Sequence, residues 1–309
     1  MKTLILCNSD VLSAPLIHHL NSTQELLAVG FPETNAERLK NTFASLNLEG
    51  DRMKVFNRSN FNEELQKWIK QFEPELLLTL TFPWVLPTDV LQSIKFGAYN
   101  FHFGTLPKYR GADPIFWQIK NGEESVSLTV HQISSQIDKG PILQENKIPI
   151  IPGVNYGYLA ETYAAQTINT FNEVKNRIRE KAELKEQEVE ESKFENAPSY
   201  LDLKINWELQ GADEIENLVN AANPKYNGAI TSINNIPIHL LEVSPADYQI
   251  DAKKDIVPGE VVYADLIYGL VVSTCDSKFL KISVALLSGG YYSGSKLFVM
   301  GFKVGNRFI

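Results

Sequence analysis

Three polar side chains in the first half of the chain have types and spacing that suit chemistry on a bound substrate. Asn100 and His102 close an apolar stretch, and the alternation of side chains along a strand places both on one face. Asp138 follows a second apolar stretch, and a carboxylate at a neighbouring strand end can orient an imidazole or raise its pKa. An Asn-x-His pair alone is a weak signal, because a single histidine near a strand end is more often structural. The combination of an amide, an imidazole and a carboxylate makes these residues the candidate catalytic group.

The elements that must position this group alternate between strands and helices. Short apolar runs predict strands at Thr3–Cys7, Leu26–Phe31, Glu75–Phe82, Ala98–Phe103 and Ser125–Ile133. Helical spacing of apolar residues predicts helices at Val11–Leu20, Asn60–Phe72, Pro87–Ile94, Asp113–Lys120 and Tyr156–Arg179. This alternation predicts an α/β fold, with a mainly parallel, twisted, Rossmann-like sheet and helices on both faces. Ligands of such sheets bind beyond the carboxyl ends of the strands, where the three polar side chains are expected.

The pattern of the sequence changes near residues 195–205. The mixed-charge stretch Lys181–Lys193 is expected to be a solvated helix end and linker. After a helix at Asp213–Ala222, short β-like runs broken by turn residues predict a small β-barrel. We therefore expect a catalytic domain, a linker and a β-barrel domain at residues 1–195, 196–205 and 206–309.

The composition is that of a globular protein. The 309 residues are 44% hydrophobic, and 37 Asp and Glu against 29 Lys and Arg give a formal net charge of −8. No apolar run reaches the roughly 18 residues that cross a bilayer, and the apolar start is too short for a signal peptide. Two distant cysteines predict reduced thiols, and five histidines without ligand spacing predict no metal site. We expect a cytoplasmic protein that binds neither membrane nor DNA.

The candidate residues lie in three motifs whose order is specific. These are Asn100-Phe101-His102, Leu106-Pro107-Lys108-Tyr109-Arg110-Gly111 and Ile137-Asp138-Lys139-Gly140-Pro141-Ile142-Leu143. Together they resemble the formyltransferase family that uses 10-formyltetrahydrofolate, in which an Asn, a His and an Asp form the catalytic group. Val257–Val262 and the residues around Asn223 and Gly228 resemble the OB-like C-terminal barrel domain of methionyl-tRNA formyltransferases. The resemblance covers nearly the whole chain and implies a transferase of one-carbon metabolism and protein biosynthesis.

The resemblance also implies a mechanism for the three residues. An acceptor amine attacks the formyl carbon, and a tetrahedral oxyanion develops. Asn100 can donate an amide N–H and His102 a ring N–H to that oxygen, and removal of one such donor typically costs about 10²–10³ in rate. His102 could instead take the proton of the attacking amine, and both roles stay open. Asp138 would orient and support the imidazole, and no metal is required.

The resemblance places the folate in the crevice at the strand ends. It implies that the segment after the histidine contacts this co-substrate, through Gly104, Thr105, Leu106 and Pro107. Members of the family commonly have Ser-Leu-Leu-Pro there, so Gly104 and Thr105 depart from the pattern. Gly104 removes a hydroxyl, which puts that side-chain contact in doubt and leaves backbone contacts possible.

One loop and two charged residues complete the implied binding site. The pterin would lie against the loop that holds Phe82, Trp84 and Leu86, because an apolar slot with backbone amides suits a flat heterocycle. The alternative is that Phe82 and Trp84 are core aromatics. Arg110 could bind an acidic group of the substrate or brace its loop through carbonyl contacts. Asp113 would add an anion near the acceptor, which suits a cationic amine better than a phosphate backbone.

Two hypotheses remain, and they differ in the amine that accepts the formyl group. The C-terminal domain favours initiator methionyl-tRNA as the acceptor. Transfer-RNA formyltransferases, however, usually carry a Gly-rich and basic insertion after the second strand, and residues 31–40 lack that character. Acidic residues also outnumber basic ones in residues 1–150, 151–199 and 200–309 alike, whereas a tRNA-binding barrel should present a basic face. These two observations favour a small amine, such as an amino-sugar nucleotide or an amino acid derivative.

Two further classes fit less well. A non-catalytic binding protein with the same fold would not need an intact Asn, His and Asp group. A dinucleotide dehydrogenase is disfavoured because the first strand-to-helix turn, Cys7-Asn8-Ser9-Asp10-Val11-Leu12, lacks the glycines that let a backbone approach a pyrophosphate. The sequence therefore predicts a formyltransferase whose acceptor is undecided.

Overall fold

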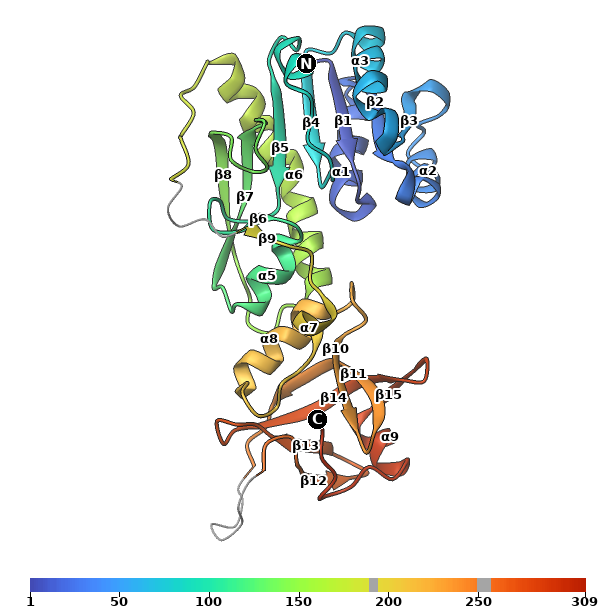
Figure 1. Ribbon diagram of the computed structural model, residues 1–309, viewed down its shortest axis with the longest axis vertical. Coiled ribbons are helices and arrows are strands. Elements are labelled where there is room, and N and C mark those ends of the chain that lie inside the picture. The colour runs from blue at the N-terminus through green and yellow to red at the C-terminus, as the bar shows by residue number, and fades with distance from the viewer. Residues whose placement is uncertain (189–193, 249–256) are drawn as a thin grey trace. The chain divides into compact units, whose positions relative to one another are not determined.

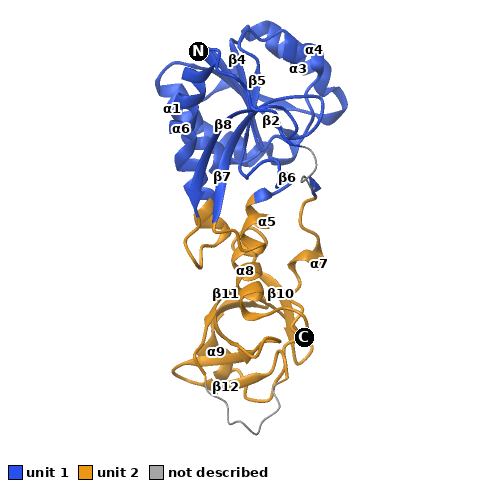
Figure 2. Ribbon diagram, turned by 90° about the vertical axis from the view of Figure 1, so that its left-hand side faces the viewer, with its two compact units in different colours: residues 1–114, 125–149, 160–195 blue, residues 115–124, 150–159, 196–309 orange. Residues whose placement is uncertain are grey.

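The structure is a computed structural model. It describes residues 1–188, 194–248 and 257–309. The chain forms two compact units, coloured separately in Figure 2. Unit 1 consists of residues 1–114, 125–149 and 160–195, and unit 2 consists of residues 115–124, 150–159 and 196–309. Two short segments from the first part of the chain thus belong to unit 2. The domain limits expected from the sequence stay a proposal.

A mixed sheet forms the centre of unit 1 (Figure 1). In spatial order its strands are β3 (Met53–Phe56), β2 (Leu26–Pro32), β1 (Thr3–Cys7), β4 (Leu76–Leu80), β5 (Ala98–His102), β7 (Ser125–Gln132) and β8 (Ile142–Pro149). The pairs from β3 through β5 are parallel, and the pairs β5–β7 and β7–β8 are antiparallel. The predicted α/β fold with a mainly parallel sheet is confirmed. The sequence did not predict β8, because its middle residues are polar and only half-buried.

Helices cover both faces of this sheet. Figure 2 shows α1 (Asp10–Ser22) and α6 (Tyr156–Arg179) on one face and α3 (Phe61–Phe72) on the other. The shorter helices of the first part of the chain are α2 (Ala36–Ala44), α4 (Thr88–Gln92) and α5 (Pro114–Lys120). Among the described residues, no helix has both the length and the apolar character needed to cross a bilayer.

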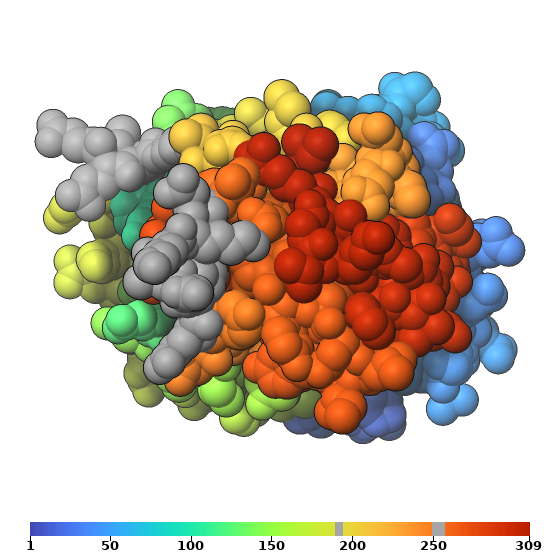
Figure 3. All heavy atoms as spheres, turned by 90° about the horizontal axis from the view of Figure 1, so that it is seen from below, coloured from blue at the N-terminus to red at the C-terminus, as the bar shows by residue number. Residues whose placement is uncertain are grey.

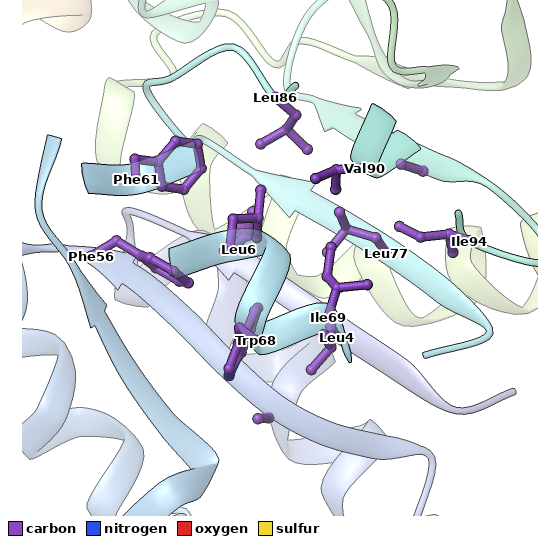
Figure 4. Close-up of a cluster of buried hydrophobic side chains, with 13 residues drawn as sticks. Leu4, Leu6, Phe56, Phe61, Trp68, Ile69, Leu77, Leu86, Val90 and Ile94 are labelled. Carbon is purple, nitrogen blue, oxygen red and sulfur yellow. The ribbon is translucent and has the colours of Figure 1, made fainter. Parts of the chain in front are cut away.

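The apolar face of α3 packs on the sheet in the cluster that Figure 4 shows. Phe61, Trp68 and Ile69 of α3 are buried together with Leu4 and Leu6 of β1. Their spacing along the helix puts these three side chains on one stripe, which explains why the segment folds as a helix against the sheet. Burial of each such side chain is worth about 1.5–3 kcal/mol. This layer fixes the central strands beside β5, which carries Asn100 and His102.

An antiparallel sheet dominates unit 2. In spatial order its strands are β10 (Ala229–Ile233), β11 (Ile236–Pro245), β14 (Phe279–Leu287), β13 (Gly269–Ser273) and β12 (Val261–Asp265), and β15 (Gly290–Ser293) also pairs with β14. Its helices include α7 (Tyr200–Leu203), α8 (Ala212–Ala222), which lies against β11, and α9 (Gly294–Val299), which lies against β13. This sheet is the β domain that the sequence predicted.

The last residues of the chain join the two ends of this sheet. In the described residues no strand pair links β10 directly to β12, so a closed OB-like barrel stays a prediction. Instead, Phe308 forms a bridge with Ile233 of β10, and Arg307 forms one with Glu260, which directly precedes β12. Figure 3 shows the face of unit 2 on which these C-terminal residues, drawn red, meet the preceding strands, drawn orange.

The two cysteines lie in different surroundings. Cys7 ends β1 and is buried, and burial raises the pKa of its thiol to about 12. Cys275 lies between β13 and β14 and is exposed. Both cysteines are free in the structure.

Candidate active site

Asn100 lies near the carboxyl end of β5 in a row of side chains that crosses the sheet. The strand register places Thr79 of β4 on one side of Asn100 and His131 of β7 on the other. Thr79 Oγ1 donates to Asn100 Oδ1 at 2.7 Å, so the amide nitrogen is directed the opposite way. That nitrogen lies 3.1 Å from His131 Nε2 and 3.3 Å from Asp138 Oδ1. Thr79 therefore fixes Asn100 with its donors toward an imidazole and a carboxylate.

Asp138 lies in the loop after β7, and its side chain accepts hydrogen bonds from two sides. Oδ2 accepts from the Gly111 N–H at 2.9 Å and lies 3.7 Å from His102 Nδ1. Burial alone would raise the pKa of this carboxyl, but the neighbouring imidazoles and the Gly111 N–H outweigh burial and hold the pKa well below its usual range. Asp138 is therefore an ionised carboxylate at neutral pH.

His102 is buried at the end of β5, with only 5% of its surface exposed. Its Nε2 lies 2.7 Å from the carbonyl oxygen of Tyr109, so Nε2 carries a proton and donates it to that oxygen. Burial lowers the pKa of His102, and the charge of Asp138 opposes this shift only in part. The imidazole is therefore neutral at pH 7. Nε2 can act on a substrate only after its bond to Tyr109 breaks.

His131 completes this group, and the sequence reasoning missed it. The ring is 2% exposed, its Nδ1 donates to the Gln132 carbonyl at 3.0 Å, and its Nε2 lies 3.1 Å from the Asn100 amide nitrogen. His131 Nε2 also lies 3.4 Å from Asp138 Oδ1. Only the antiparallel register of β5 and β7 brings position 131 opposite position 100, and a single sequence does not show a register.

Gln187 corrects the expectation for the stretch Lys181–Lys193. Residues 189–193 lie outside the described residues, but Gln187 is described and is only 9% exposed. Its amide nitrogen donates to the carbonyl oxygens of Asp138, at 2.9 Å, and Gly140, at 2.6 Å. A solvated linker is therefore the wrong interpretation at this position. The Glu and Lys residues around Gln187 dominate the charge pattern, and Gln187 is the buried side chain among the described residues 181–188.

The residues expected to contact the folate follow β5 directly. Gly104 is buried, and a Cβ at this position would lie 2.6 Å from Pro114 Cβ and 3.1 Å from His102 Nε2. The departure from Ser therefore has a steric reason. The Gly104 carbonyl accepts from Thr129 Oγ1 at 2.8 Å. Thr105 and Pro107 are half-buried and Leu106 is buried, and their contacts with a folate stay predictions.

The aromatic residues of the expected pterin loop pack on α3. The Phe61 ring centroid lies 5.4 Å from that of Phe82 and 4.9 Å from that of Trp84, and Leu86 belongs to the same buried cluster. These contacts agree with the alternative that Phe82 and Trp84 are core aromatics. A cavity of about 630 Å³ is lined by residues 58–63 and 85–87, and none of the candidate catalytic residues in the described chain lines it.

The two charged residues expected to contact the substrate lie in different surroundings. Arg110 is 2% exposed, and its Nη2 donates to Gln187 Oε1 at 3.2 Å, which favours the bracing role over contact with an acidic substrate group. Asp113 is half-buried and directly precedes α5. No group of three or more potential metal ligands is found in the described part of the chain.

Two family models match the chain. The formyl transferase model matches residues 31–174, and the model of the formyl transferase C-terminal domain matches residues 199–303. The chain belongs to the formyl transferase family. The resemblance inferred from the three motifs is thereby confirmed, and the protein is an enzyme that transfers a formyl group.

Curated relatives extend this similarity over nearly the whole formyl transferase chain. The methionyl-tRNA formyltransferase of Carboxydothermus hydrogenoformans is 27% identical over 300 residues, which is 95% of this chain and 95% of the relative. The methionyl-tRNA formyltransferase of Mycoplasma mycoides is 28% identical over 295 residues, which is 92% of this chain and 90% of the relative. Both parts of this formyl transferase are thus present in full-length relatives.

Solved structures share the fold. HypX of Aquifex aeolicus, solved in complex with tetrahydrofolic acid, matches 98% of this formyl transferase with a TM-score of 0.67 and 16% identity, and this chain spans 48% of HypX. An N-formyltransferase of Helicobacter canadensis, solved with folinic acid and dTDP-3-aminofucose, matches 91% of this chain and 98% of its own with a TM-score of 0.62 and 20% identity. At these identities the similarity establishes the fold alone.

Proposed function

We propose that this formyl transferase moves the formyl group of 10-formyltetrahydrofolate to the amino group of initiator methionyl-tRNA, and that Asn100, His102 and Asp138 carry the reaction. Relatives named methionyl-tRNA formyltransferase support this acceptor, since one aligns with 95% of each chain. The match of residues 199–303 to the C-terminal domain model supports it further. The observation that carries the chemistry is the convergence of an amide, an imidazole and an ionised carboxylate, with neighbouring polar atoms 3.3–3.7 Å apart.

In the proposed reaction, the lone pair of the acceptor amine attacks the formyl carbon. A carbon–nitrogen bond forms, and the carbonyl oxygen becomes the oxyanion of a tetrahedral intermediate. The bond between that carbon and the donor nitrogen then breaks, the oxyanion returns to a carbonyl, and the donor nitrogen takes up a proton. The proton lost by the amine balances the one gained by the leaving nitrogen, so no oxidant, reductant or metal is needed.

The side chains divide this work according to their protonation states. The Asn100 amide would donate one N–H to the oxyanion in place of its present contact with His131 or Asp138. Once the bond to Tyr109 breaks and the ring proton moves from Nε2 to Nδ1, beside Asp138, a neutral His102 can accept the amine proton at Nε2, and the ionised Asp138 stabilises the imidazolium that results. Once protonated, His102 can return the proton to the leaving nitrogen.

A small amine is the second candidate acceptor, and one structural observation favours it. The segment after β2, where the tRNA enzymes usually have a basic insertion, folds into the short helix η1 (Glu33–Asn35) and α2. The Arg38 guanidinium of α2 forms an ion pair with Asp10 at 3.4 Å, which offsets part of its positive potential. With a net charge of −8, this leaves little positive potential for a phosphate backbone.

A competition assay distinguishes the two acceptors. The enzyme is given 10-formyltetrahydrofolate with charged initiator tRNA in one series and with a panel of amino-sugar nucleotides in the other, at increasing salt. Formyl-methionyl-tRNA whose formation falls steeply with salt supports the tRNA acceptor, and formylation of an amino sugar alone discards it. The His102→Ala variant is the control for enzymatic turnover. Failure to formylate any of these acceptors would contradict both proposed acceptors.

A further inference from the structure

The side chain of Gln187 bonds through all of its polar atoms to the loops that hold the candidate catalytic group. The segment that carries it follows α6 and is anchored by two backbone hydrogen bonds between Lys185 and Ile142, at 2.7 and 2.8 Å. Gln187 is thereby brought beneath the loop that precedes β8, and only 9% of its surface is exposed. A buried amide whose polar atoms all make hydrogen bonds is expected to hold the surrounding loops in one conformation.

The orientation of this amide is fixed by its partners. Its nitrogen donates to two carbonyl oxygens, those of Asp138 and Gly140, and a carbonyl oxygen can only accept. Its oxygen accepts from Arg110 Nη2 at 3.2 Å, and a guanidinium can only donate. Exchange of the amide oxygen and nitrogen would replace three attractive contacts by three repulsive ones. Gln187 therefore joins two loops in one arrangement.

Asp138 needs such support because of its backbone conformation. Its φ of +52° lies in the left-handed region, which is less favourable for a residue with a Cβ than for glycine. Gln187 holds the carbonyl of Asp138, and the Gly111 N–H holds its carboxylate. With both ends held, the carboxylate stays 3.7 Å from His102 Nδ1. Without the contact to its carbonyl, the backbone of Asp138 can relax and carry the carboxylate away.

Arg110 connects Gln187 to the other side of the same carboxylate. Gly111, whose N–H binds Asp138, directly follows Arg110, and both residues form the short strand β6 (Arg110–Gly111). The contacts thus form a closed ring that runs from Gln187 to Asp138, to Gly111, to Arg110 and back to Gln187. We propose that Gln187 is a positioning residue for formyl transfer, which holds the Asp138 carboxylate against His102 by tying the two loops together. This inference rests on the proposed catalytic role of Asp138.

Two substitutions test the role of Gln187. Gln187→Met keeps the length of the side chain and removes every hydrogen bond, and Gln187→Asn keeps the amide but shortens its reach by one methylene. Displacement of a catalytic group by about 1 Å costs up to 10²-fold in rate, so we expect both variants to lose about 10- to 100-fold in kcat. The KM for the folate donor should change little. Steady-state kinetics on the full-length enzyme measure both constants.

The pH profile separates positioning from general damage. His102 faces Asp138, His131 and the Tyr109 carbonyl, and among these only the charge of Asp138 strongly favours the protonated imidazole. If Asp138 moves away, the pKa of His102 falls, and the acidic limb of kcat/KM should shift to lower pH. If Gln187 had only a structural role, its substitution would lower the fraction of active enzyme, and the midpoint of the acidic limb would not move.

A matched control and a second background complete the experiment. Glu186→Gln changes the exposed neighbour of Gln187 and should leave kcat, the pH profile and the melting temperature unchanged. In an Asp138→Asn background, where single-turnover assays measure the residual rate, Gln187→Met should change the rate by less than about twofold, because both substitutions act on the same group.

Two results would overturn the inference in distinguishable ways. If Asp138→Asn is inactive but Gln187→Met keeps wild-type kcat and an unmoved pH profile, Gln187 does not position Asp138 and the proposed function stands. If Asp138→Asn itself keeps wild-type turnover, the catalytic assignment fails together with the positioning role. If the rate losses of Asp138→Asn and Gln187→Met add in the double variant, Gln187 acts on a group other than Asp138.

Discussion

Burial acts in opposite directions on the two ionisable side chains that face each other in the candidate site. It lowers the pKa of His102, because the charged imidazolium loses hydration, and it would raise the pKa of Asp138 for the same reason. The Gly111 N–H and the imidazoles reverse the second effect, so the carboxylate keeps its charge. At neutral pH the pair therefore combines a neutral base with an anion that stabilises the protonated base.

The pH dependence of turnover follows from this pair. A base must be unprotonated, and the pKa of His102 lies below its ordinary value of 6.5. We expect the limb of the pH profile that reports His102 to have its midpoint below 6.5, separate from the limb of the acceptor amine, whose ordinary pKa for an α-amino group is about 7.7–8.0. A pH–rate profile with a small amine or tRNA acceptor measures the midpoint. A second midpoint above 6.5 that stays in place when acceptors of different amine pKa are compared would show that burial does not govern this imidazole, or that another group is the base.

Thr79 offers a test of the Asn100 orientation. Thr79→Val keeps the shape of a side chain that is 5% exposed but removes the hydroxyl that holds Asn100 Oδ1. The Asn100 amide can then rotate, and we expect kcat to fall about tenfold, against about 10²–10³ for Asn100→Ala. Thr88→Val, at an exposed position, is the control. Equal, wild-type turnover in Thr79→Val and the control would contradict the role of this hydrogen bond.

At the residue scale, the sequence allowed the three motif residues to be predicted but not their partners. Asn100, His102 and Asp138 lie in patterns that can be read locally. His131 and Gln187 become neighbours of Asp138 only through the strand register and the return of the chain after α6. Such contacts join positions that are tens of residues apart, and no local pattern reports them.

At the scale of elements, the loop between β7 and β8 leaves no space for a side chain at Gly140. A Cβ there would lie 1.7 Å from the Gln132 carbonyl oxygen, which also accepts from His131. We expect Gly140→Ala to displace this loop, to lower the melting temperature and to reduce kcat at least tenfold, because Asp138 and His131 both move. Thermal unfolding and steady-state kinetics measure the two effects.

Gly153 supplies the comparison for this substitution. A Cβ at Gly153 meets no atom within 4 Å, although the residue has a φ of +79°. Gly153→Ala should therefore cost only the left-handed strain, about 1 kcal/mol, and leave turnover unchanged. Gly140 itself does not lie in the left-handed region, so a wild-type melting temperature and turnover in Gly140→Ala would contradict the role of its close contact with Gln132.

The accuracy of the predicted elements followed the strength of their apolar pattern. The α3 segment carries apolar residues at helical spacing, and the predicted and observed helices agree to one residue. β3 and β8, at the two edges of the sheet, are only partly buried, so their sequences lack the apolar run of a central strand. Helix α2 was not predicted, and only two of its nine residues, Leu39 and Phe43, are buried, so its apolar pattern is weak.

At the scale of the whole molecule, each unit has a core of its own, so we expect local changes in stability. Phe308 is 1% exposed, its ring centroid lies 5.4 Å from that of Trp207, and its backbone bridges to β10. Phe308→Ala should destabilise unit 2 by about 3–5 kcal/mol, the usual cost for a buried phenylalanine. Peptides from residues 199–309 should then exchange amide hydrogens faster than in the wild type.

Two comparisons make this prediction specific. Peptides from β1, β4 and β5 in unit 1 should keep wild-type exchange rates in the Phe308→Ala variant, because the units have separate cores. Ile309→Ala, which alters a side chain that is 61% exposed, should leave exchange unchanged throughout. Faster exchange in both units of the Phe308→Ala variant would show that they unfold together.

The change of sequence pattern near residue 195 located the β domain, but the units are not two consecutive stretches. Residues 115–124 and 150–159 belong to unit 2 although they precede that change. Their sequences continue the pattern of strands and helices found before and after them, so composition gives no signal for their membership. Only contacts between distant segments reveal it.

The contrast between the two cysteines makes selective labelling possible. Cys7 is buried and its thiol titrates far above neutral pH, whereas Cys275 is exposed. A maleimide dye should therefore attach at one position and report from the β domain without mutagenesis. Changes in its fluorescence anisotropy on addition of tRNA or of a nucleotide sugar would show which acceptor engages this part of the enzyme before any chemistry occurs.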